Sequence, residues 1–159
     1  MATRLPSLGP RGEGWVALQS VLLVLLIAST TLGRVGDDPG RVVLATVGIV
    51  ILAAGLALGV AGFLRLGRRF TALPRPKPGG RLVDDGPYRL VRHPMYGGIV
   101  IAGVGAALVT VSPMTLLFAA IALGFFTLKS MREEAWLEER FPDYPAYRAR
   151  TKRLIPFLY

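Results

Sequence analysis

The chain has 159 residues, of which 52% are hydrophobic and 18% charged, and its mean hydropathy is +0.49. A chain this short and this apolar is not an ordinary soluble domain, so we expect a small integral membrane protein. The absence of cysteine excludes disulfides and thiolate chemistry, and a single histidine argues against a protein-bound metal. The net charge of +9 would suit nucleic acid, but the basic residues border apolar stretches, so we expect no nucleic-acid partner.

Four apolar stretches are predicted to be membrane-crossing helices. The first covers residues 14–32, in which Gln19 is the only amide, and about 20 residues suffice to cross a hydrocarbon core of about 30 Å. A signal peptide is the alternative for this stretch, but the apolar run is long for one and no soluble domain follows it. Only Ser112 and Pro113 separate the last two stretches, which we therefore expect to pack as a helical hairpin. The other three predicted spans are residues 42–64, 96–111 and 114–128.

The basic residues predict how the chain is oriented. Of the 19 Lys and Arg residues, seventeen fall before the first span, between the second and third, or after the fourth, and only Arg34 and Arg41 fall between the first and second. The positive-inside rule then places both termini, the loop 65–93 and the tail 129–159 in the cytoplasm. We expect one all-α domain over residues 1–159, a four-helix bundle of the cell (inner) membrane with a helical cytoplasmic extension. In the loop, the proline-rich stretch 73–80 is predicted to be an extended connector.

The loop ends in the stretch GPYRLVRHPMYGG, residues 86–98, which contains the only histidine of the chain. Proline suits the first position of a helix, so the third helix is predicted to begin at Pro94 with His93 just outside it. A helix start carries free N–H groups and the positive end of the dipole, and Arg89 and Arg92 add charge. This combination favours a site for a carboxylate or a phosphate. For any single arginine, the alternative is contact with lipid headgroups.

Small residues recur in the second and third spans. Gly98, Ala102 and Ala106 are spaced by four residues, and Gly55 and Gly59 show the same spacing. Such faces allow the backbone to approach either another helix or a bound ligand, and the spacing alone leaves both open.

The tail after the fourth span carries two pairs of glutamates. Glu138 and Glu139 are expected on a solvated face, whereas Glu133 and Glu134 come within about two turns of the membrane edge, on the same side as His93. Carboxylates that face a cationic site suggest a ligand that carries both charges.

These motifs resemble those of the small integral-membrane methyltransferases that include the isoprenylcysteine carboxyl methyltransferases and the phospholipid N-methyltransferases. The resemblance rests on LVDDGPYRLVRHPMYGG, the pair Glu133-Glu134 and the ending YPAYRARTKRLIP, and less on LRLGRRFT. Membrane sterol reductases share the Arg-His-Pro-x-Tyr element alone. The chain departs from the family at Gly55-Leu56-Ala57, where phospholipid methyltransferases have Gly-x-Gly, and in the spacing from Phe141 to Tyr144, which leaves the acceptor class open.

The resemblance implies S-adenosylmethionine as the cofactor. Arg92, His93 and the N–H groups after Pro94 would then hold its carboxylate. Glu133 or Glu134 would accept hydrogen bonds from its ammonium or ribose hydroxyls. Aromatic side chains would pack on the adenine or face the sulfonium. The remaining residues assigned to the cofactor are Tyr88, Tyr96 and Gly98, with Trp136 as a further aromatic candidate.

The methyl acceptor is expected to be lipophilic and to enter from the bilayer. A carboxylate acceptor needs no base, whereas an amine must lose a proton, and His93 and Glu134 are the candidates for that catalytic role. Residues assigned to the acceptor are Arg89, Trp136 and Arg153. Two other functions stay open: an NADPH-dependent membrane reductase of related architecture, and a non-catalytic scaffold or small transporter. The oligomeric state is not predicted.

Overall fold

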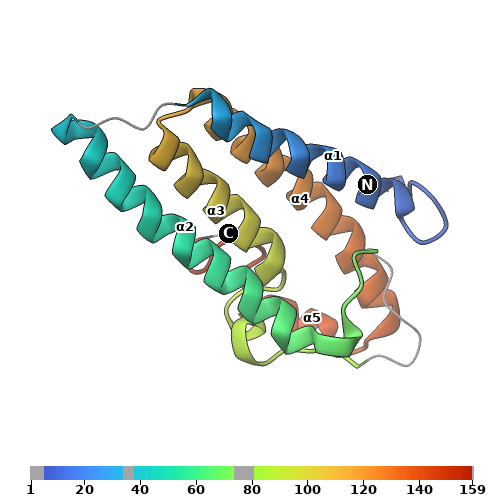
Figure 1. Ribbon diagram of the computed structural model, residues 1–159. Coiled ribbons are helices and arrows are strands. Elements are labelled where there is room, and N and C mark those ends of the chain that lie inside the picture. The colour runs from blue at the N-terminus through green and yellow to red at the C-terminus, as the bar shows by residue number, and fades with distance from the viewer. Residues whose placement is uncertain (1–5, 34–37, 74–80, 159) are drawn as a thin grey trace.

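The computed structural model describes residues 6–33, 38–73 and 81–158, so most of the proline-rich connector lies outside the described residues. The described residues are helical and contain no β-strand, although Val91 and Lys152 form an isolated parallel bridge. The elements, shown in Figure 1, are α1 (Glu13–Ser29), η1 (Thr30–Leu32), α2 (Pro39–Leu66), η2 (Gly67–Arg69), η3 (Gly86–Arg89), α3 (Pro94–Thr110), α4 (Pro113–Arg140) and α5 (Tyr144–Arg150). The all-helical prediction is therefore confirmed.

Proline and a capping side chain set the start of the long helices. α2 begins at Pro39, where the Asp38 carboxylate accepts a hydrogen bond from the backbone N–H of Arg41 at 3.1 Å. α4 begins at Pro113, where the Ser112 hydroxyl accepts from the backbone N–H of Thr115 at 3.2 Å. α3 begins at Pro94 with His93 as its N-cap residue, as the sequence predicts.

Three helical segments of the described residues are long and apolar enough to cross a membrane: Glu13–Leu32, Pro39–Leu66 and Pro113–Arg140. α3 is apolar but has only 17 residues, so a fourth crossing stays a prediction. α4 has 28 residues, a length of about 42 Å, which exceeds a hydrocarbon core of about 30 Å. Its charged end, from residue 132 onward, therefore extends beyond the apolar part of the helix.

The helices pack in the order α2, α3, α4 and α1, with α3 between α2 and α4 (Figure 1). The predicted hairpin of α3 and α4 is present, and Val111 turns the chain there in the left-handed conformation. The core lies where α1, α3 and α4 meet. Its buried members are Leu22, Tyr96, Val100, Ala122, Phe126 and Leu154.

α2 contacts α3 through glycine. The buried residues of α2 are Gly48, Gly55 and Gly62, at seven-residue spacing. A Cβ added to Gly98 of α3 would lie 2.6 Å from the carbonyl oxygen of Gly55, which is closer than real contacts allow. Gly98, assigned to the cofactor from sequence, therefore lies in the contact between two helices.

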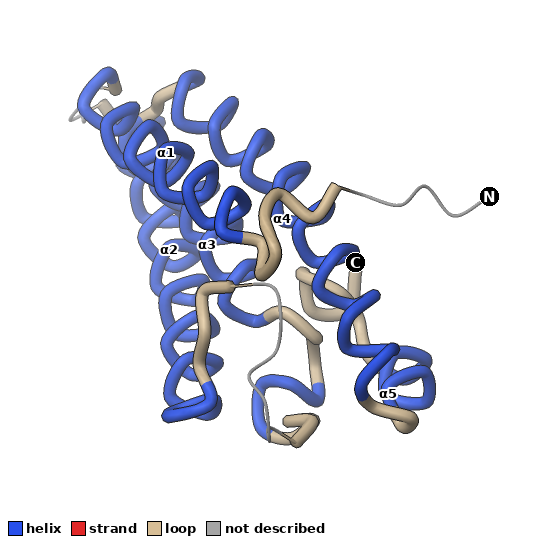
Figure 2. Tube along the Cα trace, turned by 90° about the vertical axis from the view of Figure 1, so that its right-hand side faces the viewer, coloured by secondary structure: helices blue, strands red, loops and turns tan. Residues whose placement is uncertain are grey.

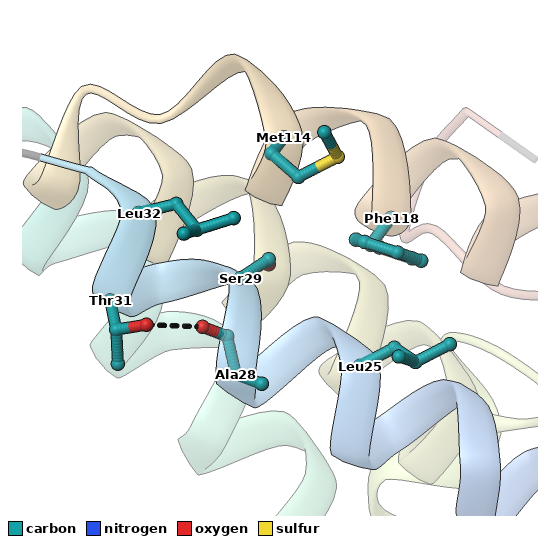
Figure 3. Close-up of a pocket in the computed structure, with 7 residues that line it drawn as sticks. All are labelled: Leu25, Ala28, Ser29, Thr31, Leu32, Met114 and Phe118. Atoms are coloured by element: carbon teal, nitrogen blue, oxygen red, sulfur yellow. Dashed lines mark hydrogen bonds between the residues drawn. The ribbon is translucent and has the colours of Figure 1, made fainter.

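A shallow apolar recess lies between the end of α1 with η1 and the first turns of α4 (Figure 3). No charged side chain lines it among the described residues, and its one marked hydrogen bond runs from the Thr31 hydroxyl to the carbonyl of Ala28 at 2.8 Å. It lies at the opposite end of α4 from Glu133 and Glu134. The charged residues of α4 are instead gathered in its last turns. The lining residues are Leu25, Ala28, Ser29, Thr31, Leu32, Met114 and Phe118.

Candidate functional site

Three segments meet at the charged end of the bundle: the start of α3, the last turns of α4 and the residues after α5 (Figure 2). The backbone N–H of Arg92 donates to the carbonyl of Lys152 at 2.8 Å, and that of His93 donates to the carbonyl of Arg153 at 3.0 Å. The chain then crosses α3 so closely that a Cβ on Gly97 would overlap the carbonyl oxygen of Leu154. Two motifs far apart in the sequence are thus joined through their backbones.

Glu134 is the centre of this cluster. Its side chain is buried, with the residue only 3% exposed, and it accepts hydrogen bonds from Arg92 Nε at 2.9 Å and from Arg153 Nη2 at 3.2 Å. His93 Nε2 lies 3.2 Å from the same carboxylate. Arg92 also donates through Nη1 to the carbonyls of Arg148 and Thr151. The cationic residues that the sequence assigned to a ligand are therefore also bound to a carboxylate of the protein.

The surroundings of Glu134 decide its charge. Burial by itself raises the pKa of this carboxyl, but hydrogen bonds and the charge of His93, together with Arg92 and Arg153, lower it to about 2. The side chain is outside the apolar part of α4. Glu134 is consequently an ionised, fully engaged carboxylate at neutral pH.

Glu133 and Tyr96 form the other side of the cluster. The Tyr96 hydroxyl donates to Glu133 Oε2 at 3.0 Å, and the same oxygen lies 3.8 Å from His93 Nδ1. The ring of Tyr96 stacks on that of His93, with centroids 5.4 Å apart, and on that of Phe126 at 4.8 Å. The imidazole thus lies between two carboxylates, in an orientation fixed by stacking.

Three buried tyrosines come from η3 and α5. The Tyr88 hydroxyl donates to the carbonyl of Gly62 at 3.4 Å, and the Tyr147 hydroxyl donates to the carbonyl of Tyr88 at 2.8 Å. The Tyr144 hydroxyl is buried and has no hydrogen-bond partner among the described residues. Burial raises the pKa of Tyr144 above its usual value, and the charge of Glu134 raises it further. Burial likewise raises the pKa of Tyr88 and of Tyr147, so all three are neutral phenols.

The structure brings together most of the residues predicted for the site, but not all. The predicted members that meet are Arg92, His93, Pro94, Tyr96, Glu133, Glu134 and Arg153. Arg89 is exposed at the end of η3, and Trp136 packs against the guanidinium of Arg132, which lies 4.2 Å from its ring centroid. Tyr88 joins η3 to α2 through its hydroxyl.

The sequence interpretation missed three residues beside the cluster. Lys129 was counted among the charges of the tail, yet its side chain is fully buried. The carbonyl oxygen of Thr151 accepts a hydrogen bond from Arg92, and Tyr144 contributes a buried hydroxyl. A lysine directly after an apolar run was the signal for Lys129, whereas backbone acceptors leave no trace in sequence. No group of three or more metal-ligating side chains occurs within the part of the chain described here.

The apolar helices indicate a helical membrane protein. The buried ionic cluster at their charged end is a polar site of the kind that enzymes use. The phospholipid methyltransferase family model matches residues 43–144, and the chain belongs to this family. The matched segment includes most of α2, all of α3 and α4, and both halves of the His93–Glu134 contact.

Curated relatives include proteins with two different names. The chain is 30% identical over 115 residues to protein-S-isoprenylcysteine O-methyltransferase B of Arabidopsis thaliana, covering 70% of this chain and 58% of the plant protein. It is also 32% identical over 113 residues to the nickel-cobalt-cadmium resistance protein NccN of Alcaligenes xylosoxydans xylosoxydans, covering 68% and 53% of the two chains. The chain thus spans less than two thirds of these relatives.

A solved structure has a similar fold. It is that of the eukaryotic intramembrane Ras methyltransferase ICMT, an isoprenylcysteine carboxyl methyltransferase. The TM-score is 0.68 at 21% sequence identity, and the match covers 94% of this chain and 55% of the other. The likeness shows that the two chains share a fold.

Proposed function

We propose that this protein transfers a methyl group from S-adenosylmethionine to a lipophilic acceptor at the cytoplasmic face of the membrane. Family membership and the isoprenylcysteine O-methyltransferases among its relatives support this reaction class. The observation that carries the proposal is the buried contact of Glu134 with Arg92, His93 and Arg153, directly beside apolar helices. A prenylated cysteine is the first acceptor to test, and other isoprenoid or lipid carboxylates and amines follow.

The residues of the cluster fit the amino-acid part of S-adenosylmethionine. The α-carboxylate calls for hydrogen-bond donors, which Arg92, His93 and Arg153 supply. The α-ammonium calls for a carboxylate such as Glu133, which is more exposed than Glu134. The buried Tyr144 hydroxyl, with no partner among the described residues, is an additional polar group in this region. We therefore assign the cofactor to this end of the bundle.

The protein's part in the reaction is alignment and the exclusion of water. S-adenosylmethionine supplies an electrophilic methyl group, which an acceptor oxygen or nitrogen takes up in line with the departing sulfur. Glu134 fixes the two guanidinium groups and the imidazole of His93, so it acts as a positioning residue. The stacked ring of Tyr96 holds His93 from the apolar side.

A general base is needed only for an amine acceptor. With its pKa lowered to about 2, Glu134 is a poor base, so of the two predicted candidates we favour His93. The ring nitrogens of His93 lie 3.8 Å from Glu133 and 3.2 Å from Glu134, which fixes the direction in which the imidazole points.

Methyl transfer by the purified protein tests the proposal. The full chain in detergent is incubated with S-adenosylmethionine carrying a radiolabelled methyl group and with S-farnesylcysteine or extracted lipids. We expect label in the organic phase, strongly reduced by Glu134→Gln and unchanged by Glu139→Gln, an exposed glutamate of the same helix. Binding of NADPH without binding of S-adenosylmethionine would instead favour a reductase.

A further inference from the structure

Lys129 is a buried cation that the mechanism above does not use. It is 0% exposed and lies one helical turn before Glu133, at the end of the apolar part of α4. Its ammonium donates to the side-chain oxygen of Gln19 on α1 and to the carbonyl of Ala72 at 3.2 Å. Both acceptors are neutral. The contact also explains why the first apolar stretch contains an amide.

Burying the ammonium of Lys129 costs desolvation free energy that a purely structural contact would not need. Among the described residues no carboxylate lies within 4.0 Å of the ammonium, although buried charges in proteins are normally paired. The carboxylate that interacts electrostatically with the ammonium of Lys129 is that of Glu133, which already accepts a hydrogen bond from Tyr96. An uncharged side chain such as methionine would fill the same space without the cost of desolvating a cation.

The position of Lys129 connects it to the candidate site. Its Nζ lies 5.1 Å from the centroid of the Tyr96 ring, which stacks on His93. Along α4 it lies on the apolar side of Glu133, where the polar end of a lipophilic molecule would arrive from the bilayer. An ammonium has three donors, and its two acceptors among the described residues leave one donor for a ligand.

We propose that Lys129 binds a carboxylate in the active site. The inference rests on the proposed function, because that function provides two sources of this group: the methyl acceptor and the amino-acid part of S-adenosylmethionine. An anionic ligand would supply the counter-ion that Lys129 lacks among the described residues, and its position on the apolar side of the cluster suits an acceptor best.

Calorimetry in detergent with two ligand pairs tests this role in the full chain. One pair is S-farnesylcysteine and its carboxamide, and the other is S-adenosylhomocysteine and its methyl ester. If Lys129 donates a hydrogen bond to the carboxylate, the wild type should bind the acid of one pair tenfold to a hundredfold more tightly than its neutral counterpart. Lys129→Met should strongly reduce this preference for that pair. Arg140→Met, which removes an exposed cation from the same helix, should keep it.

Each outcome decides between the assignments. Loss of preference in the farnesylcysteine pair assigns Lys129 to the acceptor, and loss in the adenosyl pair assigns it to the cofactor. The proposal is overturned if the wild type shows no preference in either pair, or if Lys129→Met folds and keeps the wild-type preference. Lys129→Gln, which can still donate to the Ala72 carbonyl, gives the same test should the methionine variant not fold. A wild type that shows the preference yet transfers no methyl group counts against the proposed function only.

Discussion

α2 and the charged end of α4 contact the rest of the protein in opposite ways. The buried residues of α2 are three glycines, so backbone lies against backbone and most of its apolar side chains face outward. The end of α4 buries Glu134 under two arginines and a histidine. In a bilayer, apolar side chains gain little by leaving lipid, so close packing of small residues holds α2. Directional ionic contacts hold the site.

The largest effect is expected from removing the central carboxylate. Glu134→Ala leaves Arg92 and Arg153 without their buried partner, which costs roughly 3–5 kcal/mol when one member of such a pair is lost. We expect a large fall in the thermal unfolding temperature in detergent. Glu139→Ala is the matched control and should unfold like the wild type. Equal unfolding temperatures for both variants would show that the cluster contributes nothing to the fold.

Acid should weaken the same cluster without any mutation. The pKa of Glu134 is lowered in the folded protein to about 2, so its contribution is complete above about pH 4.5 and is lost as the pH falls toward 2. This contribution amounts to about 3 kcal/mol at most. Unfolding followed from pH 6 to pH 2 should therefore show a loss of stability that is smaller in Glu134→Gln. An identical acid profile in the two proteins would contradict the lowered pKa.

The glycine contact predicts a smaller but clear effect. In Gly98→Ala the new Cβ would lie 2.6 Å from the Gly55 carbonyl oxygen and 2.7 Å from Gly59 N, and both are backbone atoms that cannot turn away. Overpacking of this kind costs roughly 1–3 kcal/mol. Gly124→Ala on α4 is the control, because apart from its chain neighbours and the backbone of its own helix no described atom lies within 4 Å of the place its new methyl group would take. Yield and unfolding temperature should fall for the first variant alone, and Gly98→Leu should be worse still.

The smallest effect is expected at Tyr96. Tyr96→Phe keeps the ring that stacks on His93 and Phe126 but removes the hydrogen bond to Glu133. A hydrogen bond to a charged group is worth roughly 1.5–3 kcal/mol when its loss leaves the partner unpaired, and less where water reaches Glu133. Methyl transfer should fall a fewfold to tenfold with little change in unfolding. An unchanged rate would leave Tyr96 as a packing residue.

The sequence predicted those parts of the fold that depend on neighbouring residues. Pro94 starts α3 because its ring suits the first helical position, and Ser112-Pro113 leaves room only for a tight turn. The proximity of Glu133 and Glu134 to His93 followed from placing all three at one membrane face. Such arguments need only local chemistry and membrane topology.

Tertiary contacts could not be predicted from local chemistry and membrane topology. Sequence spacing did not reveal that the backbone after α5 pairs with Arg92 and His93, or that Glu134 would bind the cations assigned to a ligand. Gly98 illustrates the same limit, since its small size suits a ligand or a helix equally, and only the approach of Gly55 decides that it contacts α2. The buried state of Lys129 likewise depends on α1.

Binding of S-adenosylhomocysteine to His93→Ala tests the central claim most directly, with Arg140→Ala as the control and thermal unfolding measured alongside. His93 stacks on Tyr96 and lies within reach of both glutamates, so the account predicts an affinity lowered on the order of tenfold to a hundredfold while the protein stays folded. Arg140→Ala should bind like the wild type. Normal binding by folded His93→Ala would contradict the assignment of the cofactor to this cluster.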